Sequence, residues 1–102
     1  MNPLIENHRR SITELCRRYG VHRLDLFGSA TGADFDPHQS DVDFMVEFTD
    51  QRPEGAADRY FGLQGDLQQV LGRPVDLVMR SAVKNPYFQK SVERQQLNLY
   101  AA

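Results

Sequence analysis

The sequence has almost no cysteine and no long hydrophobic run. Cys16 is the only cysteine among 102 residues, so the chain cannot close an internal disulfide. No apolar stretch approaches the roughly 20 residues that a membrane-spanning helix needs. The N-terminal segment carries Arg9 and Arg10 in a helical pattern and lacks the apolar stretch of a signal peptide. We therefore expect a cytoplasmic protein with a buried thiol and no membrane partner.

The chain also lacks a surplus of positive charge. Its formal net charge is −2, which argues against a nucleic-acid partner, because duplex binding normally shows as a basic excess. The charges are unevenly placed: five arginines precede Leu24, whereas the segment 25–58 has nine acidic residues and one base, Arg52. An acidic segment of this kind is usually a solvated surface, but it can also hold cations.

Length limits the organisation of the protein. A chain of 102 residues is too short for two separate cores, so we expect one domain over residues 1–102. Internal repeats and low-complexity tracts are absent. The thin core expected at this size is compatible with a homodimer or with a stable complex with another protein.

Hydrophobic periodicity predicts alternating helices and strands. The spacing of apolar residues, with Gly20 and Gly72 as stop signals, predicts two long helices, and period-two alternation predicts short strands. The predicted helices cover 4–19 and 60–71, with a further helical stretch at 87–94, and the predicted strands cover 23–27, 41–48, 74–79 and 97–100. This order predicts an α/β (α+β) fold with a small mixed β-sheet and helices packed against it.

The strand over 41–48 has one apolar face and one face that begins with two carboxylates. Asp41 and Asp43 are two residues apart, so they share a face and lie roughly 7 Å from each other. Two carboxylates in this position suit a hard cation such as Mg²⁺, which completes its shell with water and phosphate oxygens. An isolated pair of this kind is more often two exposed side chains at the start of a strand.

Two further features favour a nucleotide site. Gly28 would let the backbone approach a phosphate, and Ser29 would offer it a hydroxyl and an N–H, although Gly-Ser alone is only a turn. Asp76 interrupts an apolar strand, where a buried carboxylate needs a partner or a metal. If the strands of Asp43 and Asp76 are neighbours, the aspartates converge and could hold two metal ions along a triphosphate. Ser40 is close enough in sequence to touch the same nucleotide.

The stretch LFGSATGADFDPHQSDVDFMVEF, with GRPVDLV downstream, resembles the minimal nucleotidyltransferases of the DNA polymerase beta superfamily. These are small prokaryotic domains often encoded beside HEPN-domain ribonuclease toxins, and the resemblance covers nearly the whole chain. It implies a polymerase-beta-like fold, ATP as substrate and Mg²⁺ as cofactor. By this resemblance the phosphates are gripped by Gly28 and Ser29, the metal is held by Asp41 and Asp43, and the third acid, which activates the acceptor, is Asp76.

The resemblance implies a function and leaves alternatives. It implies transfer of AMP to a hydroxyl, such as a tyrosine, of a partner HEPN-type toxin, with this chain as the antitoxin. The chain departs from the family at Gly32-Ala33, where members often carry Arg-Gly, and eleven residues separate Ser29 from Asp41 where ten is commoner. One alternative is a catalytically weak module that neutralises the toxin by binding it. The other is transfer to a small molecule, which the absence of a second domain disfavours.

Overall fold

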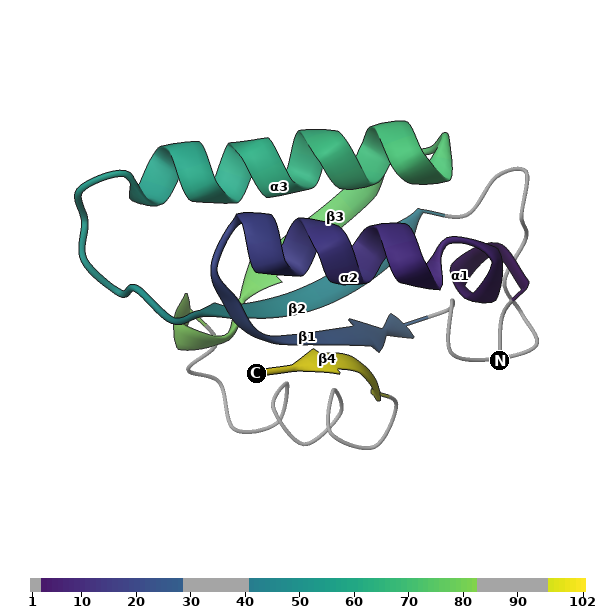
Figure 1. Ribbon diagram of the computed structural model, residues 1–102, viewed down its shortest axis with the longest axis horizontal. Coiled ribbons are helices and arrows are strands. Elements are labelled where there is room, and N and C mark those ends of the chain that lie inside the picture. Colours follow the sequence, from purple (N-terminus) through teal and green to yellow (C-terminus); the bar gives the residue numbers. More distant parts are fainter. Residues whose placement is uncertain (1–2, 29–40, 83–95) are drawn as a thin grey trace.

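The computed structural model describes residues 3–28, 41–82 and 96–102. Their four strands form one sheet in the order β3-β2-β1-β4, with β2 and β3 parallel and the other pairs antiparallel. Helices α2 and α3 cover one face of this sheet (Figure 1). The elements are α1 (Pro3–Asn7), α2 (Arg9–Arg18), β1 (Val21–Phe27), β2 (Val42–Phe48), α3 (Ala56–Leu71), β3 (Val75–Met79), a 3-10 turn (Arg80–Ala82) and β4 (Leu97–Ala101). The predicted mixed sheet with helices packed against it is confirmed.

The first helical segment is interrupted at His8, so the prediction of one helix over 4–19 is wrong. An α-helix requires the N–H of each residue to bond to the carbonyl four positions earlier. Here the Nδ1 of His8 donates to the Leu4 carbonyl (2.8 Å), and the His8 backbone N–H bonds to the Ile5 carbonyl (3.1 Å). The ring takes the place of the helical bond, which separates α1 from α2.

The hydrophobic core lies between the sheet and the two longer helices. The predicted apolar face of β2 packs beneath α2 and α3, while Met45, on the other face, is also buried. Cys16 is fully buried in this core, and burial raises the pKa of its thiol to about 12. The thiol is therefore an unreactive core side chain, as expected. The buried core residues of the two long helices and the central strands include Ile12, Leu15, Leu24, Leu26, Val42, Phe44, Val46, Leu63 and Leu67.

Helix α3 protects the outer edge of the sheet. β3 is an edge strand, and an uncovered edge would present unpaired backbone groups. Gln64 donates to the Val75 carbonyl (3.0 Å), Gln68 accepts from the Val75 N–H (3.2 Å), and the Tyr60 hydroxyl donates to the Leu77 carbonyl. These bonds fix β3 beside β2. None of the helices in the described ranges is long and apolar enough to cross a membrane.

The two glycines inside α3 differ in their surroundings, which gives a test of the packing. Alanine stabilises an exposed helix position by about 1 kcal/mol relative to glycine. A Cβ at Gly65 would meet no described atom within 4 Å, whereas a Cβ at Gly62 would lie 2.7 Å from the Tyr19 ring. That ring is fixed by a 2.5 Å hydrogen bond from its hydroxyl to Asp66. We expect Gly65→Ala to raise the free energy of unfolding in urea by about 1 kcal/mol, and Gly62→Ala to lower it by about 1 kcal/mol through overpacking. Equal effects at both positions would contradict this packing.

Candidate active site

The parallel pairing of β2 and β3 brings two of the predicted aspartates together. Asp43 on β2 is directly in register with Asp76 on β3, and their side chains are hydrogen-bonded to each other. The apolar residues on either side of Asp43 face the helices, so its carboxyl lies on the opposite face of the sheet. The predicted convergence of the two strands is confirmed, and the register places the two carboxyls at the same level.

Burial and neighbouring negative charge raise the pKa of Asp43 to about 6. Burial contributes most, followed by the hydrogen bond to Asp76, the charge of Asp76 and the charge of Asp41. Two carboxyls in contact cannot both ionise without an electrostatic penalty, which disfavours the ionised form of Asp43. The pair therefore carries a stored electrostatic cost that a bound cation would relieve.

Gly28 lies against this pair at the end of β1. Phe27 is in register with Asp43, and the next residue, Gly28, has φ of +75°. A Cβ at this position would lie 2.5 Å from Oδ2 of Asp43, so only glycine fits. Ser29 and Ser40, the other predicted nucleotide contacts, lie outside the described residues.

Asp41 and Asp76 differ from the sequence expectation in their surroundings. Asp76 is exposed rather than buried, because it lies on the open face of an edge strand. The argument that it needs a metal to compensate its burial is therefore wrong, and Asp43 is the partly buried member of the pair. Asp41 is exposed immediately before β2. Within residues 3–28, 41–82 and 96–102, no three acidic, His or Cys side chains form a preassembled metal site.

The contact between Gly28 and Asp43 gives a test with a matched control. Gly20 also has a positive φ, +67°, but a Cβ there would meet no described atom within 4 Å. Gly28→Ala and Gly20→Ala should both lose about 1 kcal/mol of stability from the left-handed backbone. Only Gly28→Ala also displaces the Asp43 carboxyl, so we expect at least a roughly 10-fold loss of nucleotidyl transfer from that variant alone. Equal activity in the two variants would contradict a role for this close approach.

A second polar cluster on the open face was not predicted from the sequence. Asp25 on β1 is fully buried, and its carboxylate contacts Arg23 (2.8 Å), Arg80 (2.6 Å) and Asn98 (2.9 Å). Strand alternation indicates that Asp25 points away from the core, but the sequence gives no sign that side chains 55 and 73 positions later cover it. Arg80 also approaches Glu47 on β2 (4.0 Å), so it links two strands, β1 and β2, on this face.

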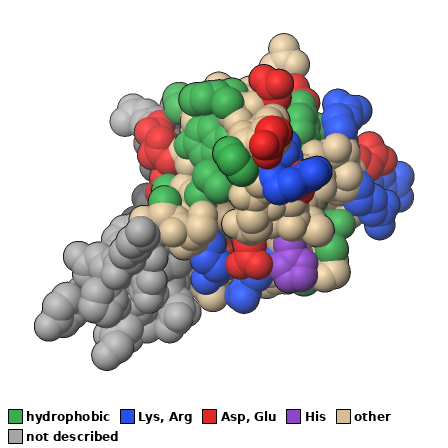
Figure 2. Space-filling model, turned by 90° about the vertical axis from the view of Figure 1, so that its left-hand side faces the viewer, with side chains coloured by type: hydrophobic (Ala, Val, Ile, Leu, Met, Phe, Trp, Pro, Cys, Tyr) green, Lys and Arg blue, Asp and Glu red, His purple; other side chains and the backbone are tan. Residues whose placement is uncertain are grey.

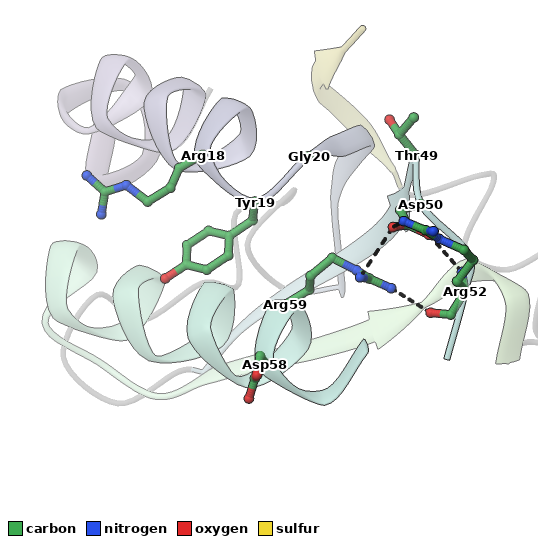
Figure 3. A pocket seen from close by; sticks show the side chains of 8 residues that line it. All are labelled: Arg18, Tyr19, Gly20, Thr49, Asp50, Arg52, Asp58 and Arg59. Carbon is green, nitrogen blue, oxygen red and sulfur yellow. Dashed lines mark hydrogen bonds and ion pairs between the residues drawn. The ribbon is translucent and has the colours of Figure 1, made fainter. Parts of the chain in front are cut away.

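A cavity of about 620 Å³ lies at the opposite end of the sheet (Figure 3). It is formed where α2 leads into β1 and where the segment after β2 leads into α3. Arg59 points between Asp50 and the backbone of Arg52, and Arg52 makes a two-bond ion pair with Asp50 (3.0 and 2.9 Å). These charges satisfy one another, and none of the predicted site residues lines the cavity. The Asp43–Asp76 end is therefore the candidate active site.

The fold and the family comparison define the class of protein. A sheet that presents a carboxyl pair beside a glycine turn is the arrangement expected for nucleotidyl transfer, and the family model described as "Nucleotidyltransferase domain" matches residues 8–96. The chain belongs to this nucleotidyltransferase family, and its fold is the predicted polymerase-beta-like one.

Particular proteins resemble the chain over most of its length. A Methanocaldococcus jannaschii protein, MJ0128, provisionally named a protein adenylyltransferase, is 34% identical over 90 residues, covering 88% of this chain and 85% of its own. A solved structure provisionally described as a minimal nucleotidyltransferase matches with a TM-score of 0.75 and 27% identity over 91% of this chain and 90% of its own. A chain from the complex of the tri-AMPylated Shewanella oneidensis HEPN toxin with MNT antitoxin matches with a TM-score of 0.67 at 21% identity, over 95% and 72%. This last match shows a shared fold.

Proposed function

We propose that this chain transfers AMP from Mg-ATP to a tyrosine hydroxyl of a partner HEPN-type toxin and thereby acts as its antitoxin. The observation that carries the proposal is the hydrogen-bonded Asp43–Asp76 pair, which lies on the open face with Gly28 against it. Carboxylates held close together suit a site for metal-bound phosphates.

The donor set fits Mg²⁺. Asp41, Asp43 and Asp76 would hold the ion through carboxylate oxygens, which are the ligands that it prefers. The raised pKa of Asp43 supports this fit, because a cation beside the pair favours the ionised form of both carboxyls. When bound, Mg²⁺ neutralises charge on the triphosphate and lowers the pKa of the acceptor hydroxyl.

The residues of the chain would contribute binding, orientation and proton removal. Gly28 lets the Asp43 carboxyl lie against the backbone at the end of β1. We propose that the Gly28 backbone approaches a phosphate there and that Ser29 and Ser40 donate hydrogen bonds to the same phosphate. The Asp76 carboxylate, exposed on β3, accepts the proton of the acceptor hydroxyl. The hydroxyl oxygen forms a bond to the α-phosphorus, the bond from that phosphorus to the leaving oxygen breaks, and pyrophosphate departs with the electron pair.

A protein acceptor agrees with the shape of the site. Asp76 is exposed on β3, and the large cavity in Figure 3 lies at the other end of the sheet. A protruding side chain on another protein could reach such an exposed carboxylate. The adenylyltransferase name of the M. jannaschii relative and the AMPylated HEPN toxin in the Shewanella complex support this choice of acceptor.

The test is transfer of label from α-labelled ATP. The purified chain would be incubated with Mg²⁺, the labelled ATP and a lysate of the source organism, beside an Asp41→Ala/Asp43→Ala variant. We expect one labelled protein band that requires the intact aspartates and Mg²⁺, and peptide mass analysis should place one adenylyl group on a tyrosine.

The alternatives predict different results. Toxin neutralisation by the double variant, with no label transferred by either protein, would replace the proposal with a binding module. Label found only on a small molecule would replace it with small-molecule nucleotidyl transfer.

A further inference from the structure

The outer face of α3 carries an exposed aromatic side chain beside an unexplained glycine. Phe61 is 65% exposed, the more exposed of the two large hydrophobic side chains at the surface of the described residues. Gly65, one helical turn later, is also exposed. Figure 2 looks onto the end of the molecule where α3 begins and shows hydrophobic side chains gathered in its upper part.

The two glycines of α3 differ in whether a contact within the chain explains them. Gly62 is required by the chain itself, because the Tyr19 ring occupies the space of a Cβ. A Cβ at Gly65 would meet none of the described atoms within 4 Å, yet an exposed glycine weakens a helix relative to alanine. A glycine on a helix surface leaves room for the close approach of another molecule.

Phe61 is held in place for such a contact. Its ring packs edge-on against Tyr60, with ring centroids 5.0 Å apart, and the Tyr60 hydroxyl is bonded to the Leu77 carbonyl on β3. The ring therefore projects from a fixed base, which lowers the entropy lost on binding.

The exposed residues around Phe61 follow the spacing of a helix-packing seam. They recur at alternating intervals of three and four, the pattern by which one helix packs along another. These residues are Asp58, Phe61, Gly65, Gln68 and Gly72, all exposed.

This seam is complementary to itself when two copies run antiparallel. Pairing centred on Leu63 places Phe61 of each copy over Gly65 of the other, and Asp58 opposite Gln68. Asp58 in the first turn of the helix and Glu54 just before it then lie near the end of the partner's helix, which Arg73 follows. Antiparallel helices also oppose their dipoles favourably.

We propose that α3 is the contact surface of a homodimer, in which two copies pair antiparallel with Phe61 of each packed over Gly65 of the other. The partner is a second copy of this chain, because a two-fold rotation places the Phe61 ring of each copy over the gap at Gly65 of the other. The same rotation brings the acidic residues of each copy near Arg73 of the other. Helix α3 covers the face of the sheet opposite Asp43, so both active sites stay open in this dimer.

Sedimentation equilibrium on the full chain tests the association. Over about 5 to 500 µM we expect a reversible monomer–dimer equilibrium with a dissociation constant in the micromolar range, since a single helix seam is a small interface. Phe61→Ser should weaken association at least about 10-fold. Leu97→Ser, which removes the other exposed large hydrophobic side chain, should leave it unchanged. A chain that stays monomeric throughout would overturn the proposal.

Gly65→Gln separates an interface from a purely structural role. Glutamine is a better helix former than glycine, so we expect the melting temperature of dilute protein to rise by a few degrees, about 4 °C. The same side chain fills the gap that receives Phe61, so dimerisation should fall at least about 10-fold. A stabilised variant that dimerises normally would overturn the proposal.

Disulfide trapping tests the orientation. Asp58→Cys and Gln68→Cys variants would be mixed and oxidised, while Cys16 stays buried with a raised pKa of about 12 and does not react. An antiparallel seam yields mostly the mixed disulfide, and a parallel seam would yield homodisulfides and overturn the arrangement. The Phe61→Ser, Leu97→Ser, Gly65→Gln and Asp58→Cys variants should keep label transfer, so a failure of dimerisation is distinguishable from a failure of the proposed function. If the chain stayed monomeric and used Phe61 to bind a different protein, the homodimer proposal would also be overturned.

Discussion

Asp43→Asn is expected to abolish transfer and to stabilise the metal-free protein at neutral pH. Loss of the carboxylate removes a proposed metal ligand and the partner of Asp76, so transfer should fall on the order of 10³-fold. The same change removes the ionisable carboxyl whose burial, together with its contact with Asp76, raises the pKa of Asp43 to about 6. Catalytic function and stability are therefore expected to change in opposite directions at this position.

The stability effect has a defined pH dependence. The folded chain binds the Asp43 proton up to about pH 6, whereas the unfolded chain releases it near the ordinary aspartate pKa of 3.8. Between these values the folded state holds more protons, so this group makes stability fall as pH rises, and the full penalty persists above pH 6. Asp43 is partly exposed, so the penalty is about 1 kcal/mol rather than the full value of the pKa shift.

Melting temperatures of the wild type and Asp43→Asn should be compared in EDTA from pH 3.5 to 8. The variant should melt about 4 °C higher at pH 7–8, and this advantage should disappear near pH 4. Glu47→Gln, on the same face of β2 but at its other end, is the control and should keep transfer. An advantage of equal size at every pH would show that the gain does not arise from the carboxyl pair.

Arg80→Met is expected to destabilise the protein by about 3 kcal/mol, because it removes a partner of a fully buried carboxylate. Asp25 would keep Arg23 and Asn98, so the protein should still fold. Arg23→Met should cost less, about 1 kcal/mol, because the Arg23 side chain is more exposed than that of Arg80.

A double-mutant cycle in urea isolates the Asp25–Arg80 interaction. Arg80→Met combined with Asp25→Asn no longer leaves a buried charge short of a partner, so the double variant should be more stable than the sum of the single losses predicts, by about 2 kcal/mol. Strictly additive losses would mean that the cluster acts through packing alone and that the buried charge of Asp25 is unimportant.

Local patterns account for what could be predicted. The alternation of β2 defined its core face and placed Asp43 on the other, and Gly72 ends α3 in a left-handed conformation, as its position indicated. The match of motif order, Gly28, Asp41, Asp43 and then Asp76, indicated the family before any distance was known. These features depend on neighbours in the chain, which the sequence displays directly.

Long-range contacts account for what could not be predicted. The sequence by itself determined the class of fold, the short strand near the C-terminus, and the placement of Asp41 and Asp43 on one face of their strand. Only the tertiary structure decided the β2–β3 register that sets Asp43 against Asp76, the exposure of Asp76, and the closure of Arg80 and Asn98 over Asp25. The tertiary structure also decided that Gly62 has no room for a side chain whereas Gly65 does, because the Tyr19 ring at the end of α2 packs against Gly62. Each of these depends on side chains that meet across many positions of sequence, and no local pattern encodes which ones will meet.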